Sequence, residues 1–394
     1  MSRPSRRRGH IAMVGIPAIS HTLPSLEIIR ELVARGHRVT YANDPYMADV
    51  IKPTGAEFVP FESTLPVADN DWPEDPIAAM TLFLDDAVHV LPQLRAVYDR
   101  DPADVYLYDI GAYPARVLAE TQGRPLVQLS PTIVGWEGYH DEVGAQIMSL
   151  PGADVYQEKF ATWLVESGAA TTDPNAFSGL PPRCVALIPR AMQPNADRVN
   201  TEVVTFVGPC LGDRADQGGW ERPAGAENVL LVSLGSAYTR QAAFYRECVA
   251  AFGELPGWHV VLQIGKYVDP GELGQIPANV EVHNWVPQLA ILERADAFIT
   301  HAGMGGSNEG LYTGCPMIAV PQGAEQAMNA DRLVELGVAR RFDTADATAG
   351  ALRAALLELT TDPEVARTSA RLRAEVRAEG GTGRAADLIE DALR

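Results

Sequence analysis

Residues 10–42, HIAMVGIPAISHTLPSLEIIRELVARGHRVTYA, decide the fold class of this chain. Residues 10–16 predict a buried β-strand, residues 24–35 predict an amphipathic helix that ends at Gly36, and residues 37–42 predict a second strand. Short apolar strands that alternate with helices are typical of a parallel sheet covered on both faces. The stretch therefore predicts an α/β fold.

The same alternation runs through the rest of the chain and restarts once. In the first half, further strands are expected at 57–61, 104–109 and 125–129, with a helix at 113–121. Residues 208–226 are rich in Gly, Asp and Pro and predict an interdomain linker. Beyond the linker we expect strands at 228–234, 258–264, 280–283, 296–300 and 317–320, and helices at 241–253 and 305–313. The chain thus predicts two doubly wound, Rossmann-like domains, 1–207 and 227–375, which bind ligands in a cleft between them, followed by a C-terminal helix at 376–394.

The composition is that of an ordinary globular protein and argues against two classes of partner. The chain has 394 residues, 46% of them hydrophobic, and a formal net charge of −19 at pH 7, which repels nucleic acid and anionic lipid at long range. Its four cysteines form no CxxC pair, which argues against a zinc site or a disulfide framework and favours a reducing, cytoplasmic compartment. We expect no membrane span, because no run of about 18 apolar residues occurs.

The N-terminus has two interpretations. Three arginines at 6–8 precede an apolar run at 11–19, as they do in a secretion signal. The same residues fit a frayed basic tail before a buried first strand. We favour the tail, because cleavage of a signal here would remove the strand that presents His21.

Residues 285–329 carry the densest motif in the chain, which reads WVPQ (285–288), HAGMGGSNEG (301–310), GCP (314–316) and PQGAEQ (321–326). Small residues at 303–307 follow a strand and open a helix, where backbone N–H groups can bind an anion at the positive helix end. His301 can donate a hydrogen bond to a diphosphate oxygen, and Glu309, expected in the first helical turn, can accept from ribose hydroxyls. The alternative is a glycine-rich turn whose carboxylate complements the helix dipole, because short glycine patterns are weak signals.

The order and spacing of these motifs resemble the donor-sugar signature of the UDP-dependent glycosyltransferases that act on small lipophilic acceptors. The first half of the chain is similar to the bacterial macrolide glycosyltransferases in particular. The resemblance implies a GT-B-like fold whose C-terminal helix packs back on the first domain, which binds the acceptor, while the second binds the nucleotide-sugar donor. It also implies these donor-binding residues: Trp285 stacking on uracil, the backbone of Val286 at the base edge, Gln288 and Glu309 on the ribose, Gly235, Ser236, His301, Gly306 and Ser307 on the diphosphate, Gly303 beside them, and Glu325 and Gln326 on the sugar hydroxyls. Trp285 as a core aromatic and Ser236 as part of a plain turn are the alternatives.

His21 is the predicted catalytic base, and Asp109 is its predicted partner. We expect His21 just beyond the first strand and Asp109 at the end of the fourth, where a Rossmann-like sheet presents ligand-facing groups. A neutral imidazole can remove the proton of an acceptor hydroxyl as it attacks the anomeric carbon, and a buried carboxylate can orient that imidazole. An ordinary histidine and a helix N-cap are the respective alternatives. His10 and His37 are weaker candidates for the base, because both lie at strand beginnings.

One departure from the family pattern concerns the acceptor. The macrolide branch usually carries Gly-His-Gly-His-Val-Asn-Pro at this point, whereas residues 17–24 read PAISHTLP. The second His of the pattern is kept as His21, but Ile19 stands for the first and Leu23 for the Asn. We therefore expect a more apolar acceptor wall than is usual for the family.

The acceptor pocket is expected in the first half, in segments without clear helix or strand character. Its candidate lining residues, for which burial in the core is the alternative, are Ile19, Trp72, Met80, Phe83, Leu84, Ile133, Trp136, Tyr139 and Phe160. We identify no Asp-x-Asp pair at the end of a predicted strand that would hold a divalent ion, so we expect neither a metal nor a cofactor. His301 and the helix terminus would stabilise the leaving UDP instead.

Three functions remain open on the sequence alone. The favoured one is inverting transfer of glucose from UDP-glucose to a macrolide or similar hydrophobic natural product, giving a β-glycoside, for antibiotic inactivation or self-resistance. The second is transfer from a TDP-deoxysugar, or to another polyketide or phenolic acceptor, in antibiotic biosynthesis. The third is a catalytically inactive homologue that activates a partner transferase. A monomer and a homodimer are equally compatible with the sequence.

Overall fold

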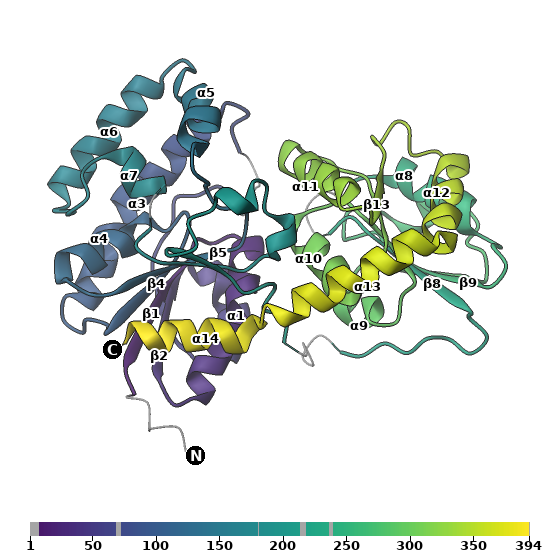
Figure 1. Cartoon of the computed structure of the whole chain (residues 1–394), viewed down its shortest axis with the longest axis horizontal. Coiled ribbons are helices and arrows are strands. Elements are labelled where there is room, and N and C mark those ends of the chain that lie inside the picture. The colour runs from purple at the N-terminus through teal and green to yellow at the C-terminus, as the bar shows by residue number, and fades with distance from the viewer. Residues whose placement is uncertain (1–7, 68–71, 180, 213–217, 236–238, 394) are drawn as a thin grey trace. The chain divides into compact units, whose positions relative to one another are not determined.

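The computed structural model describes residues 8–67, 72–179, 181–212, 218–235 and 239–393. Their contacts divide the chain into two compact units (Figure 1). Unit 1 comprises Met1–Cys210 together with Gly380–Arg394, and unit 2 comprises Leu211–Glu379. Unit 2 is thus inserted, in sequence, between the two pieces of unit 1.

Unit 1 contains a seven-stranded sheet in the order β3-β2-β1-β4-β5-β6-β7. Every neighbouring pair of strands is parallel. The strands are β1 (His10–Val14), β2 (Arg38–Asn43), β3 (Glu57–Pro60), β4 (Val105–Asp109), β5 (Leu126–Ser130), β6 (Cys184–Ala186) and β7 (Val204–Phe206). The chain order reverses between β1 and β4, and in such sheets ligands bind beyond the carboxyl ends of the strands at this switch point.

Helices cover both faces of this sheet. The α-helices of unit 1 are α1 (Ile19–Ala34), α2 (Ala48–Ile51), α3 (Pro76–Tyr98), α4 (Tyr113–Gln122), α5 (Ala145–Met148), α6 (Ala153–Glu166), α7 (Pro174–Gly179) and α14 (Gly381–Ala392). Ile11 and Met13 of β1 pack into one core with α1 and α14, whereas Ala12 and Val14 pack into the other with α3, α4 and α6. α14 lies beside α1 (Figure 1). The uniformly apolar sequence of β1 follows from this burial on both faces.

Unit 2 repeats the plan with a six-stranded parallel sheet in the order β10-β9-β8-β11-β12-β13. Its strands are β8 (Asn228–Ser233), β9 (Trp258–Gln263), β10 (Val280–His283), β11 (Ala297–Thr300), β12 (Met317–Ala319) and β13 (Ala339–Arg341). Its helices are α8 (Ala242–Phe252), α9 (Gln288–Leu292), α10 (Met304–Thr313), α11 (Ala324–Glu335), α12 (Ala349–Thr361) and α13 (Pro363–Ala378). Here the order reverses between β8 and β11.

The expected α/β class is correct, but α1 begins earlier than predicted. It starts at Ile19 rather than at residue 24, so Pro24 lies inside the helix. Proline is common at the first helical position, which is why the sequence pattern placed the start there. The consequence is that His21 lies in the first turn of α1, not in a loop before it.

The acceptor segments also have more regular structure than expected. Met80, Phe83 and Leu84 lie on α3, which is long and apolar enough to cross a membrane by length and composition alone. Leu84 and Leu91 of this helix lie in the core of unit 1. The core helix of a globular domain passes the same test, so the criterion is weak evidence for a membrane span.

Candidate active site

His21 and Asp109 are in direct contact in unit 1. β1 and β4 are neighbours in the sheet; α1 follows β1, and Asp109 is the last residue of β4. Nδ1 of His21 lies 2.9 Å from Oδ2 of Asp109. The Asp109 side chain is 1% exposed and that of His21 is 28% exposed. A carboxylate can only accept, so Nδ1 carries the hydrogen and Nε2 keeps the lone pair that a general base needs.

The Asp109 carboxylate binds His21 and does not cap a helix. Its second oxygen, Oδ1, accepts from the backbone N–H of Gly111 at 3.0 Å. The N-cap of α4 is Ala112, and no side chain caps that helix. Both carboxylate oxygens are therefore held by hydrogen bonds, which fixes the plane in which the imidazole can bind.

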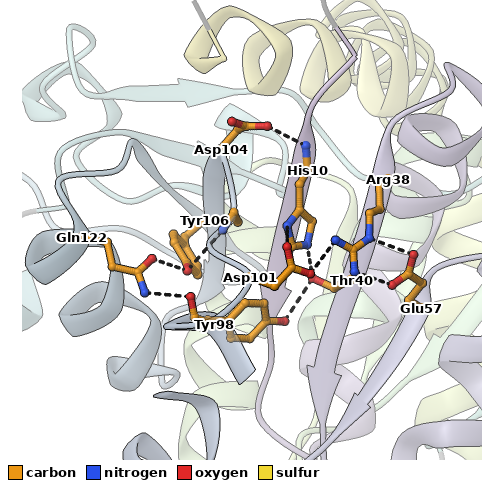
Figure 2. Close-up of polar contacts among 10 residues, drawn as sticks. His10, Arg38, Thr40, Glu57, Tyr98, Asp101, Asp104, Tyr106 and Gln122 are labelled. Carbon is orange, nitrogen blue, oxygen red and sulfur yellow. Dashed lines mark hydrogen bonds and ion pairs between the residues drawn. The ribbon is translucent and has the colours of Figure 1, made fainter. Parts of the chain in front are cut away.

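His10 and His37 lie in networks away from this site. His10 begins β1, and its Nε2 atom lies 3.0 Å from Oγ1 of Thr40 (Figure 2). Arg38 at the start of β2 binds both Glu57 and Asp101 (Figure 2). Burial lowers the pKa of His10. His37 is buried against Glu390 of α14, at 3.0 Å. Both histidines connect elements of the fold at the amino ends of the strands.

Two glycines of unit 2, Gly235 and Gly303, form a close-fitting cradle around His301. A Cβ atom on Gly235 would lie 2.7 Å from Cε1 of His301, and one on Gly303 would lie 2.4 Å from its Nε2. Gly235 follows β8 and Gly303 follows β11, and these strands are neighbours. Any larger residue at either position would collide with the imidazole.

The ring of His301 is buried and neutral. Its Nδ1 atom is buried and has no hydrogen-bond partner among the described residues. Burial also lowers the pKa of His301 to about 4, so the ring is neutral at pH 7. The adjacent Ala302 has a positive φ of 58°, rare for a residue with a side chain, and Asn329 Nδ2 holds its carbonyl at 3.0 Å. Strain of this kind gathers at ligand sites.

The start of α10 differs from expectation in detail. The helix begins at Met304 with Gly303 as its N-cap, so Glu309 lies in the second turn rather than the first. Gly306 and Ser307 are buried, whereas Gly305, another of the small residues expected at the anion, is exposed. The buried Ser307 hydroxyl has no partner among the described residues. Gly305 is thus the residue of this turn that is exposed at the surface.

The residues expected at the nucleoside lie on or next to the short helix α9. Gln288 begins this helix, and its Nε2 donates to Oε2 of Glu309 at 2.6 Å. Trp285 is 58% exposed, so it is not a core aromatic. Val286 is buried, and its backbone N–H donates to Oε1 of Gln263 at 3.2 Å. The structure therefore brings Gln288 and Glu309 together and leaves more than half of the Trp285 surface exposed.

The residues expected at the sugar lie in the first turn of α11. Glu325 is exposed and Gln326 is buried. The Oε1 atom of Gln326 accepts from the backbone N–H of Gln322 at 2.8 Å. The Gln326 amide thus has a structural role at the turn before α11, and its NH₂ group is the part that remains suited to a sugar hydroxyl.

Comparison with known proteins gives the family. The profile described as "Erythromycin biosynthesis protein CIII-like, C-terminal domain" matches residues 248–390. Over 98% of its length the chain is 57% identical to oleandomycin glycosyltransferase of Streptomyces antibioticus, of which 91% is covered. This chain belongs to the macrolide glycosyltransferase family. It is also 33% identical to the NDP-glycosyltransferase YjiC of Bacillus licheniformis, over 97% of each chain.

Solved structures confirm the GT-B fold of this glycosyltransferase. The crystal structure of the glycotransferase of kitacinnamycin superposes with a TM-score of 0.92 at 55% identity, covering 99% of this chain and 100% of that one. The resemblance inferred from residues 285–329 and from the first half of the chain is thereby confirmed.

The acceptor candidates of the glycosyltransferase separate into two groups. Ile19 is 38% exposed on the first turn of α1. Trp72 stacks on Phe83 with ring centroids 5.6 Å apart. Trp136 packs edge-on against Tyr139 with ring centroids 4.8 Å apart. Met80 and Ile133 are half-buried. Leu84 and Phe160, by contrast, lie in the core with exposures of 0% and 1%, and the Phe160 ring packs against Tyr113 of α4 and Phe177 of α7. These two residues are corrections to the predicted pocket.

Ser236 falls outside the described residues. No group of three or more His, Cys, Asp or Glu residues suited to a metal is found in the part of the chain that the structure describes. All four cysteines are buried free thiols.

Two buried glutamines, Gln193 and Gln263, join loops of the glycosyltransferase and were not predicted from the sequence. Gln193 holds both backbone groups of Val134, accepting from N at 2.9 Å and donating to O at 2.9 Å, and so fastens the loop of Ile133 and Trp136. Gln263 joins Val286 to Gly235. The only sequence signal for Gln263 is an amide in the otherwise apolar run VVLQI.

Proposed function

We propose that this glycosyltransferase transfers glucose from UDP-glucose to a hydroxyl of a macrolide or similar hydrophobic natural product, with inversion, to give a β-glycoside. The 2.9 Å contact between His21 and the buried Asp109 carries the proposal. It supports catalysis over a purely regulatory role, because an inactive homologue has no need of a buried carboxylate that orients a solvent-accessible imidazole.

The proposed reaction has one chemical step. Nε2 of His21 takes the proton of the acceptor hydroxyl while that oxygen bonds to the anomeric carbon of the sugar. The bond from the anomeric carbon to the diphosphate breaks on the opposite face, UDP leaves with the electron pair, and the configuration inverts. Asp109 stabilises the imidazolium that forms, and general-base catalysis of this kind contributes roughly a hundred- to ten-thousandfold in rate.

We further propose that unit 2 stabilises the leaving UDP without a metal ion. The neutral His301 ring, with its unpartnered Nδ1, and the amino end of α10 are suited to a diphosphate. If so, activity persists in excess chelator. Complete loss on chelation that added magnesium or manganese restores would contradict the proposal.

The donor sugar has a second candidate. Glu325 and Gln326 support glucose, because a carboxylate and an amide can bind neighbouring hydroxyls that a deoxysugar lacks. The contact of Gln326 Oε1 with the Gln322 backbone favours the alternative, a TDP-deoxysugar donor, because it takes up half of that amide. With glucose as the donor sugar, the proposed biological role is antibiotic inactivation or self-resistance of the host. The four free thiols support a cytoplasmic location.

A donor comparison separates the two candidates. We expect kcat/KM for UDP-glucose to exceed that for a TDP-2,6-dideoxyhexose by orders of magnitude with a macrolide acceptor, since a site that binds a hydroxyl rejects the analogue lacking it by up to roughly ten-thousandfold. Gln326→Ala should reduce this preference more than it weakens UDP binding. Equal or better use of the deoxysugar would show that Glu325 and Gln326 do not bind sugar hydroxyls.

A further inference from the structure

Gln263 is the last residue of β9 and is buried. Its amide makes two hydrogen bonds, each to the backbone of a different loop. Nε2 donates to the carbonyl oxygen of Gly235 at 3.0 Å, and Oε1 accepts from the N–H of Val286 at 3.2 Å. The amide orientation is determined by these partners, because the flipped amide would face a carbonyl with its oxygen and an N–H with its NH₂. One side chain thus joins the loop after β8 to the loop after β10.

The Gly235 end of this link reaches His301. The N–H of Gly235 donates to Oγ of Ser233 at 3.3 Å, so with Gln263 on the carbonyl both polar groups of this residue are held. Gly235 packs so closely on the imidazole that a Cβ atom would lie 2.7 Å from Cε1 of His301. A shift of Gly235 would therefore open the cradle of His301.

The Val286 end reaches the nucleoside side of the same unit. Val286 is buried directly after the exposed Trp285 and two residues before Gln288, which binds Glu309. The hydrogen bond to the N–H of Val286 fixes the backbone that carries the side chains of Trp285 and Gln288. The segment after β9 also touches the β8 loop a second time, because Gly265 packs against the buried Thr239.

We propose that Gln263 is a positioning residue that sets the spacing between the loop for the nucleoside and the cradle for the diphosphate. The inference rests on the proposed donor site. A ligand that spans both loops binds best when their spacing is fixed in advance, because ordering them on binding costs affinity. A nucleoside, which touches one loop, does not depend on that spacing. Gln263 should therefore affect the gain in affinity that the diphosphate adds.

The test compares uridine and UDP on the full chain by calorimetry, with the ratio of their dissociation constants as the diphosphate gain. Gln263→Met keeps the length of the side chain and removes both hydrogen bonds. Gln263→Glu keeps an acceptor for Val286 N–H and removes the donor to Gly235. Gln275→Leu, at an exposed position of unit 2, is the control.

We expect the diphosphate gain to fall at least about tenfold in both Gln263 variants and to stay unchanged in the control, since a buried partner left unpaired costs about one to two orders of magnitude in binding. Uridine affinity should stay within about threefold of wild type in Gln263→Glu, because the acceptor for Val286 remains. The methionine variant excludes charge repulsion as the cause. Thermal unfolding of each variant verifies that binding is measured on folded protein.

The outcomes distinguish this inference from the proposed function. A full diphosphate gain in the folded Gln263→Met variant would overturn the inference alone. A loss of thermal stability without any change in the gain would show a purely structural role and overturn it as well. If the wild-type chain binds UDP no more tightly than uridine, the donor site itself is refuted, and this inference with it.

Discussion

His21 and Asp109 act as one unit in the proposed reaction, and this has a consequence for double substitution. His21→Ala should lower kcat at least about a hundredfold with UDP binding nearly intact. Asp109→Asn should also be slow, because the amide favours the wrong tautomer of the imidazole. The double variant should be little slower than His21→Ala.

Steady-state and single-turnover kinetics measure these rates, and the exposed His89→Ala on α3 is the matched control. Turnover of His21→Ala close to wild type would refute the assignment of the base. Effects of the two substitutions that multiply in the double variant would show that the residues act separately.

His301 makes the stability of the chain depend on pH in a defined window. Its pKa is lowered to about 4 by burial, against an ordinary value of about 6.5 in the unfolded chain. As pH falls below about 6.5 the unfolded state binds the proton first, so stability falls until the folded state is protonated near pH 4. The loss is at most about 3 kcal/mol, because each unit of difference between the folded and unfolded pKa corresponds to about 1.4 kcal/mol.

Urea unfolding at pH 7 and pH 4.5 measures this loss, and His301→Gln should reduce it. The comparison of the two proteins cancels the contribution of the other histidines. An identical pH dependence of wild type and variant would contradict the assignment of a neutral, buried His301.

At the scale of the elements, Gln193 holds the loop that carries Ile133 and Trp136. Gln193→Leu leaves the N–H and carbonyl of Val134 without their partner, which costs about 1–3 kcal/mol. The loosened loop should raise KM for the acceptor and leave KM for the donor unchanged. Initial-rate kinetics with each substrate varied in turn measure this difference, and Gln275→Leu is again the control. An equal rise in both KM values would show that the effect is not confined to the loop.

The strands and the His21–Asp109 pair could be predicted because their signals are local. A uniformly apolar run such as residues 10–16 marks a buried parallel strand, and the ends of such strands mark a ligand site. β6 and β7 have three residues each, too few to show a period. Gln193 and Gln263 could not be predicted, because a single amide carries no motif that would pair it with the backbone of Val134 or of Val286. Leu84 and Phe160 were misplaced because an apolar side chain suits a pocket wall and a core equally.

At the scale of the whole molecule, α14 completes a core that begins at the N-terminus. Ile389 is fully buried with Ile28 and Leu32 of α1, and Arg35, which directly follows α1, binds Glu390 at 2.7 Å. Ile389→Ala should destabilise unit 1 by about 2–5 kcal/mol. Hydrogen exchange of β1 and α1 should rise, while the strands of unit 2 keep their protection.

Gly383→Ala, on the exposed side of the same helix where an added methyl group meets nothing within 4 Å, is the control and should stabilise α14 slightly. Increased exchange in unit 2 of Ile389→Ala, to the same degree as in unit 1, would contradict the assignment of α14 to unit 1 alone.

The insertion of unit 2 between the two pieces of unit 1 affects the order of events on the ribosome. Multidomain chains generally fold from the N-terminus as they are synthesised. Here the first-made unit lacks Ala385, Ala386 and Ile389, and therefore part of its core, until the segment that forms α14 emerges. Unit 2, which is one continuous segment, can complete its fold before the unit that precedes it. A nascent chain that stalls before residue 380 exposes the apolar face of α1 that α14 covers, which makes it a substrate for chaperones and proteases.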